Sequence, residues 1–225
     1  MKKGEKMRVA IFDLDGTLFD SMWVWEKLAY NYLLDKGIEA PLDIRENLKE
    51  YSLRESCDVL KERYNLSETP DEINNQMEEM LKKYYFEEIE IKPGAKELLQ
   101  KMSEIGIRIV AATATADWLS KAASKRLGIY DYFEIFQTCK AVGIEKFDPK
   151  FYKIIIEQLE IEPDNIWLFE DALHSIKAGN KCGIKIAAIR EESARSDWDE
   201  IEEVSDIVFD TFSEFLEEYP DILGL

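Results

Sequence analysis

The chain has 225 residues, 46% of them hydrophobic, and carries 47 acidic against 29 basic side chains, for a formal net charge of −18. That length and composition suit one large globular domain or a domain with an insertion. A surface this negative disfavours nucleic acid and anionic membranes, so we expect neither as a partner. An anionic small molecule would need local positive charge, from a metal ion or a lysine.

The three cysteines are widely spaced and odd in number. Cys57, Cys139 and Cys182 form no CxxC pair, which predicts reduced thiols. The apolar run before Asp13 is only about four residues long, far short of a signal-peptide core. No segment approaches the roughly 18 apolar residues of a membrane span. We therefore expect a cytoplasmic protein, and we expect it to be a monomer.

Short apolar runs alternate with helical patterns along most of the chain. The first strand-like run is Val9–Phe12. Further strand-like runs follow at 107–113, 133–137, 165–171 and 184–189, with a weaker one at 206–209. Helical patterns lie at 95–106, 118–128, 149–160 and 173–183. This alternation predicts an α/β fold with a parallel sheet covered by helices on both faces.

Residues 21–91 interrupt the alternation. Apolar residues at helical spacing predict helices in 23–37, 52–65 and 72–89, with no convincing strand between them. The chain returns to the alternation through a turn at Pro93-Gly94. We therefore expect two domains. The core is formed by residues 1–20 and 92–225, and an all-helical insertion, 21–91, lies like a lid over the end of the first strand.

Polar side chains follow several of the predicted strands. In an open parallel sheet, ligands bind outside the carboxyl ends of the strands. The residues at these ends are Asp13-Leu14-Asp15, Thr113-Ala114-Thr115 and Glu170-Asp171. Lys146 lies in a further loop, before a predicted helix. These residues are the candidates for a functional site.

In this order, the groups resemble the motifs of the haloacid dehalogenase superfamily of phosphohydrolases. DLDGT at 13–17 resembles the first motif, DxDGT, and Glu170-Asp171 resembles the acidic fourth motif. Thr113 and Lys146 match the hydroxyl residue of the second motif and the lysine of the third. The resemblance spans residues 7–189. It implies a Rossmann-like core, a three-layer sandwich, with the helical insertion as its cap.

The third motif departs from the family pattern in one place. Family members commonly have GKPxP around the lysine, whereas this chain has EKFDP. Phe147 therefore replaces the first proline, while Lys146 and Pro149 are kept. We expect the role of the lysine to survive this change.

Carboxylates gathered at one edge of a sheet need a compensating charge, and hard oxygen ligands suit Mg²⁺. The resemblance implies that Mg²⁺ is held by the Asp13 side chain, the Asp15 backbone carbonyl and the Asp171 side chain. Glu170 then acts nearby, directly or through water. Without the other motifs, the two aspartates could instead cap a helix, and Lys146 could be a solvated surface lysine.

The resemblance also implies the chemistry. Asp13 attacks phosphorus to give an aspartyl phosphate, and Asp15 acts as general acid and then as base. Thr113, Ala114 and Lys146 bind the phosphoryl oxygens. The complete implied phosphate-binding set is Asp13, Leu14, Asp15, Thr113, Ala114 and Lys146.

Substrate contacts are harder to predict from the sequence. Trp23, Lys49 and Arg54 in the insertion are candidates, and each could equally be a packing residue or a surface charge. The acidic segment 191–220 reads as a solvated face with a final strand and helix.

We expect Mg²⁺-dependent hydrolysis of a small phosphorylated metabolite, with sugar phosphates among the candidates. One alternative is a phosphomutase of the β-phosphoglucomutase type. The segment 48–56, LKEYSLRES, resembles a segment in the cap of that enzyme. Against it, Glu50 stands where that segment has a glycine, and Leu53 where it has an arginine. A dehalogenase and a catalytically silent binding module are further alternatives.

Overall fold

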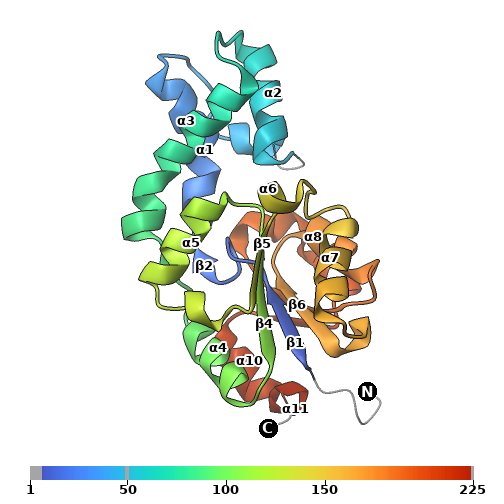
Figure 1. Cartoon of the computed structure of the whole chain (residues 1–225). Coiled ribbons are helices and arrows are strands. Elements are labelled where there is room, and N and C mark those ends of the chain that lie inside the picture. Colours follow the sequence, from blue (N-terminus) through green and yellow to red (C-terminus); the bar gives the residue numbers. More distant parts are fainter. Residues whose placement is uncertain (1–6, 49–50, 224–225) are drawn as a thin grey trace. The chain divides into compact units, whose positions relative to one another are not determined.

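A parallel sheet forms the centre of the computed structural model, which describes residues 7–48 and 51–223 (Figure 1). Six strands of the described chain form this sheet, in the spatial order β5 (Ile135–Thr138), β4 (Arg108–Thr113), β1 (Val9–Phe12), β6 (Ile166–Glu170), β7 (Lys185–Ile189) and β8 (Ile207–Phe209). Each neighbouring pair is parallel. The strand order reverses beside β1, which makes the carboxyl end of β1 the switch point where such sheets bind ligands.

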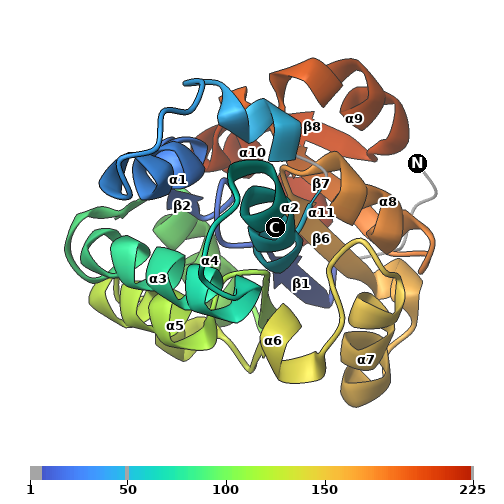
Figure 2. The same ribbon diagram turned by 90° about the horizontal axis from the view of Figure 1, so that it is seen from above.

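Helices cover both faces of the sheet. Figures 1 and 2 show α4 (Ala95–Glu104) and α5 (Asp117–Arg126) on one side, and α7 (Lys150–Leu159) and α8 (Leu173–Asn180) on the other. The described part of the sheet unit also contains the α-helices α6 (Cys139–Val142), α9 (Trp198–Val204), α10 (Phe212–Glu218) and α11 (Pro220–Leu223), and the 3₁₀ helices η3 (Tyr130–Tyr132), η4 (Pro163–Asn165) and η5 (Glu192–Asp197). The predicted α/β fold, with a Rossmann-like three-layer core, is confirmed.

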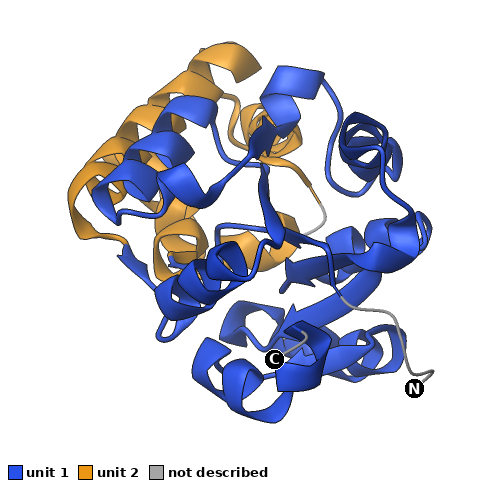
Figure 3. Ribbon diagram, turned by 60° about the horizontal axis from the view of Figure 1, so that its bottom comes forward, with its two compact units in different colours: residues 1–20, 90–225 blue, residues 21–89 orange. Residues whose placement is uncertain are grey.

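The chain divides into two compact units (Figure 3). The sheet unit comprises residues 1–20 and 90–225, and the helical unit comprises residues 21–89. The helical unit contains the helices α1 (Met22–Asp35), α2 (Leu53–Tyr64) and α3 (Pro70–Lys83), the 3₁₀ helix η1 (Ile44–Leu48) and the π-helix η2 (Tyr84–Glu88). Within the described residues, no helix is long and apolar enough to cross a membrane.

Side-chain capping defines where two of these helices begin. Ser52 accepts a hydrogen bond from the backbone N–H of Glu55, and the Glu55 side chain accepts one from the backbone of Ser52. Thr69 and Glu72 form the same reciprocal pair at α3. Such capping boxes satisfy backbone donors that the first turn of a helix leaves unpaired.

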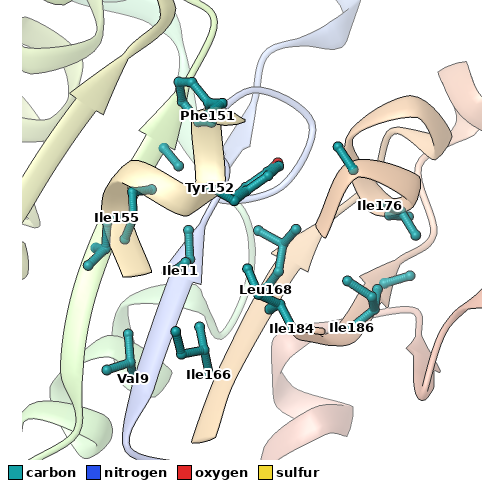
Figure 4. Close-up of a cluster of buried hydrophobic side chains, with 14 of the residues drawn as sticks. Val9, Ile11, Phe151, Tyr152, Ile155, Ile166, Leu168, Ile176, Ile184 and Ile186 are labelled. Atoms are coloured by element: carbon teal, nitrogen blue, oxygen red, sulfur yellow. The ribbon is translucent and has the colours of Figure 1, made fainter. Parts of the chain in front are cut away.

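The central strand β1 is buried on both faces. Val9 and Ile11 pack with Tyr152 of α7 and Leu168 of β6 on one side of the sheet (Figure 4). On the other side, the Phe12 ring stacks on Phe169 at a centroid distance of 4.3 Å. Burial on both faces explains why the strand reads as a continuous apolar run rather than an alternating one.

The acidic C-terminal segment contributes more to the core than its charge predicted. We expected a solvated face with one strand and one helix, but the segment contains α9, β8 and α10 and reaches the start of α11. Phe209, Phe212 and Phe215 are completely buried. The Phe215 ring lies 5.1 Å from that of Phe169. Because the segment is rich in acidic residues, its composition did not indicate that these few aromatic residues occupy core positions.

A two-stranded ribbon carries the chain out of the sheet unit and back into it. In this ribbon, β2 (Phe19–Asp20) pairs antiparallel with β3 (Glu90–Ile91), with Asp20 opposite Glu90. The Lys92 N–H donates to the Leu18 carbonyl at 2.8 Å, which extends the pairing. Strands of two residues are too short to produce a periodic pattern, so the sequence did not predict them.

Candidate active site

Three adjacent strands end at the candidate site. Because β1 lies between β4 and β6, the residues that follow these strands meet at one edge of the sheet. The backbone N–H of Asp13 donates to the Phe169 carbonyl at 3.0 Å, so the pairing of β1 with β6 continues to Asp13 itself. The sheet therefore fixes the backbone of Asp13 beside Glu170.

Asp13, Glu170 and Asp171 form a buried acidic cluster. Each offers a carboxylate oxygen, and these oxygens lie within 4.8 Å of one another. Burial raises the pKa of Asp13 well above its usual value, and Glu170 raises it further. Burial and Glu170 also raise the pKa of Asp171 to about 7. Burial first, and the neighbouring negative charge second, therefore disfavour the ionised form of both carboxyl groups.

Lys146 supplies a buried positive charge to this cluster. Its Nζ donates to Asp13 Oδ1 at 2.5 Å and to Glu170 Oε2 at 2.6 Å. Burial lowers the pKa of Lys146, but Asp13 and Glu170 outweigh burial and raise it well above its usual value. The other oxygen of Glu170 accepts a hydrogen bond from the Ala172 N–H at 3.2 Å. Glu170 thus orients the lysine that contacts Asp13.

One ammonium does not neutralise three carboxylates. The donor set is hard oxygen, and it is buried, closely spaced and negative in sum. Thr17 Oγ1 donates to Asp171 Oδ1 at 2.9 Å, which orients the third carboxylate. These features fit a divalent cation such as Mg²⁺. The side chain of Asp15 is not part of this cluster.

A tight turn connects the end of β1 to β2. The Phe19 N–H donates to the Leu14 carbonyl at 2.7 Å, and the Gly16 N–H donates to the Phe19 carbonyl at 3.1 Å. Gly16 has a φ of +84°, and a Cβ at this position would lie 2.4 Å from Asp171 Oδ2. Glycine is therefore required here for its conformation and for the close approach of the acidic cluster.

The second group of site residues follows β4. Thr113 is buried, and its Oγ1 accepts a hydrogen bond from the Thr115 N–H at 3.0 Å. No group in residues 7–48 or 51–223 accepts the hydroxyl proton of Thr113, which leaves that donor available. Ala114 is exposed. Thr115 Oγ1 donates to Asp15 Oδ2 at 2.7 Å. The sequence placed Thr115 at this strand end but assigned no role to it.

A second lysine lies near the cluster and was not predicted. Lys92, directly after β3, donates to Glu191 Oε2 at 2.5 Å. Its charge also lowers the pKa of Asp171, against the larger effects of burial and Glu170. No motif marks either partner, because Lys92 lies in a turn and Glu191 opens the acidic C-terminal segment.

The candidate substrate residues belong to the helical unit. Trp23 on α1 is 42% exposed, and its ring meets the edge of Tyr84 at a centroid distance of 5.4 Å. Arg54 on α2 is exposed and donates to Asp58 at 2.8 Å and to Asp71 at 2.9 Å. Lys49 and Glu50 lie outside the described residues.

Comparison with known proteins identifies the family. The haloacid dehalogenase-like hydrolase family matches residues 10–189, most of the chain. The chain belongs to this family. The resemblance carried by the sequence motifs is thereby confirmed. One relative, the phosphorylated carbohydrates phosphatase of Thermotoga maritima, is 24% identical over 179 residues, covering 80% of this chain and 83% of that protein.

Solved structures of other proteins share the fold. A mutant of CbbY from Rhodobacter sphaeroides, in complex with xylulose-(1,5)bisphosphate, superimposes with a TM-score of 0.80 at 21% identity, covering 93% of this chain and 96% of that one. A Thermotoga maritima protein provisionally named β-phosphoglucomutase has a TM-score of 0.73 at 22% identity, covering 95% of this chain and 100% of that one.

The contact between Gly16 and Asp171 makes a testable prediction. Gly16→Ala should destabilise the protein by more than about 1 kcal/mol, because it adds backbone strain and displaces the Asp171 carboxylate. Gly37→Ala is the matched control, since Gly37 has a φ of +71° and open space around its Cα. Thermal unfolding should show a larger loss for Gly16→Ala. Equal losses would show that strain alone matters at Gly16.

The repulsion within the acidic cluster makes a second prediction. In chelator, Asp171→Asn should raise the melting temperature by about 2–4 °C, or about 1 kcal/mol, because it removes one of three mutually repelling buried carboxylates. The amide oxygen can still accept the hydrogen bond from Thr17. Thermal unfolding followed by circular dichroism measures the change.

Adding Mg²⁺ to the same samples tests the metal assignment. Mg²⁺ should stabilise the wild-type protein and should stabilise Asp171→Asn much less, since a ligand has been lost. Glu203→Gln, at an exposed position on α9, should behave like the wild type. Equal stabilisation of Asp171→Asn and wild type by Mg²⁺ would refute the assignment of Asp171 as a ligand.

Proposed function

We propose that this chain is a Mg²⁺-dependent phosphatase of small phosphomonoesters, acting through an aspartyl phosphate, with phosphorylated sugars as the substrate class. The observation that carries the proposal is Asp13, held by Lys146 and a buried acidic cluster at the switch point of the sheet. Support for the substrate class comes from the family match and from the phosphorylated carbohydrates phosphatase among the relatives.

Asp13 is the nucleophile in this proposal. A carboxylate needs no base to activate it, but it repels an incoming phosphate. Lys146 offsets that repulsion, because its ammonium already lies 2.5 Å from Asp13 Oδ1. When bound by Asp13, Asp171 and the Asp15 carbonyl, Mg²⁺ supplies further positive charge at the phosphoryl oxygens. Attack by Asp13 on phosphorus breaks the bond to the leaving oxygen.

Asp15 is the proton donor and acceptor. Its carboxyl group gives a proton to the leaving oxygen, so that an alcohol departs rather than an alkoxide. The resulting carboxylate then accepts a proton from the water that attacks the aspartyl phosphate. This releases phosphate and restores the carboxylate of Asp13. Such proton transfer contributes typically about 10²–10⁴ in rate.

The loop after β4 binds the phosphoryl oxygens. The hydroxyl of Thr113 has a proton to donate, because its oxygen already accepts the Thr115 N–H. The backbone N–H of the exposed Ala114 is the second donor. Donors aimed at a developing negative charge stabilise the transition state. The same donors hold the phosphate product before it is released.

The helical unit is the source of substrate selection in this proposal. Its chain leaves the sheet unit through β2, which begins four residues after Asp15. The exposed indole of Trp23 is a candidate contact for the leaving group. The guanidinium of Arg54 is already engaged with Asp58 and Asp71, so a substrate anion would have to displace these partners.

Phosphate release from a panel of phosphomonoesters tests the proposal. Release should require Mg²⁺, should stop in chelator, and should fall below detection in Asp13→Asn, which lacks the nucleophile. Asp164→Asn, an exposed aspartate before β6, is the matched control and should keep full activity. Release that survives Asp13→Asn would refute the assigned nucleophile. A panel with no release at all would favour a silent binding module.

A phosphomutase is the second candidate function. The structural likeness to the protein provisionally named β-phosphoglucomutase favours it, and Leu53 in place of the expected arginine argues against it. Incubation with β-glucose 1-phosphate separates the two. A phosphatase should yield glucose and inorganic phosphate in equal amounts. Accumulation of glucose 6-phosphate would instead show transfer of the phosphoryl group to a second sugar hydroxyl.

A further inference from the structure

Thr115 connects the loop after β4 to the loop after β1. The two bonded side chains, Thr115 and Asp15, are 100 residues apart in the sequence, and their oxygens lie 2.7 Å apart. Thr115 is 4% exposed, whereas Asp15 is only partly buried. The backbone N–H of Thr115 is itself tied to Thr113 Oγ1 at 3.0 Å. A buried donor therefore holds one oxygen of the Asp15 carboxylate.

The loop of Asp15 is held by the backbone hydrogen bonds of a turn. Asp15 lies beyond the end of β1, in the turn closed by the Phe19 N–H and the Leu14 carbonyl. Those backbone bonds set the course of the chain but do not set the torsion angles of the Asp15 side chain. A charge-assisted hydrogen bond from a hydroxyl is short and directional, and it can select one rotamer. The bond from Thr115 is made to Oδ2 of this carboxylate.

We propose that Thr115 is a positioning residue that holds the carboxyl group of Asp15 for proton transfer to and from the substrate. This inference rests on the proposed phosphatase function. In the first step the proton on Asp15 moves to the leaving oxygen as the bond from that oxygen to phosphorus breaks. In the second step the Asp15 carboxylate takes a proton from water as the bond between phosphorus and Asp13 breaks. Thr115 touches neither reacting atom.

The role predicts a dependence on the leaving group. An alkoxide is a strong base and a poor leaving group, so an alkyl phosphate requires the proton from Asp15. A nitrophenolate is a weak base and leaves without one. Misplacing Asp15 should therefore slow alkyl phosphates far more than p-nitrophenyl phosphate. Damage to phosphate binding or to the fold should slow both alike.

The experiment compares Thr115→Val, Thr115→Ser and Thr138→Val with wild type in Mg²⁺. Valine keeps the size of threonine and removes the hydroxyl, whereas serine keeps the hydroxyl. Thr138 is the matched control, because it is buried at the end of the neighbouring strand β5 and its hydroxyl bonds to the Ala141 N–H instead. The measured quantity is kcat/KM for an alkyl phosphate from the panel and for p-nitrophenyl phosphate.

Thr115→Val should lower kcat/KM for the alkyl phosphate by about 10-fold or more, part of the contribution of a general acid, and should change that for p-nitrophenyl phosphate by less than about 3-fold. Thr115→Ser should restore most of the loss, and Thr138→Val should not change the ratio between the two esters. In an Asp15→Asn background, Thr115→Val should have no further effect, because the group it positions is already gone.

Equal losses for both esters, or no rescue by serine, would overturn the inference, as would an undiminished effect in the Asp15→Asn background. In each of these cases wild-type activity that depends on Asp13 would leave the proposed function standing. Absence of activity in the wild-type protein toward both esters would overturn the function, and with it this role for Thr115.

Discussion

Repulsion among buried carboxylates is the constraint on which this structure depends. Asp13, Glu170 and Asp171 share one small volume, and Lys146 donates hydrogen bonds to two of them. No set of side chains would gather in this way for stability alone, because desolvation and like charge both oppose it. The parallel sheet enforces the arrangement. Its hydrogen bonds and its two apolar faces hold the strand ends together against the repulsion.

The sequence predicted those parts of the fold and site that local patterns record. Strands buried on both faces read as short apolar runs, and β1, β4, β6 and β7 are of this kind. The site followed from the same runs, since adjacent parallel strands end at one edge. Lys146 was predicted from its place in a motif. The motif does not fix its two bonds, to Asp13 and to Glu170, because the sequence does not give the direction of a side chain.

Other features depend on contacts between distant segments that leave no local trace. Thr115 contacts Asp15, and Lys92 contacts Glu191, each across about 100 residues. The burial of the phenylalanines in the C-terminal segment was not predicted for a different reason. Phe212 and Phe215 lie close to acidic residues, on a helix of seven residues that is too short for a clear period. The composition of that segment reflects its many exposed acidic residues and does not reveal its few buried phenylalanines.

The ribbon of β2 and β3 bears on how this chain is assembled. Asp20 and Glu90 are paired across the ribbon, so the two points where the helical unit is attached lie about one strand spacing, 4.8 Å, apart. A two-residue turn spans that separation in an ordinary hairpin. The pairing of β2 with β3 therefore fixes the two chain ends between which the helical unit is inserted. Segments of other lengths can join these two ends without a change in the register of the central sheet, because none of its described pairings involves a residue between 21 and 89.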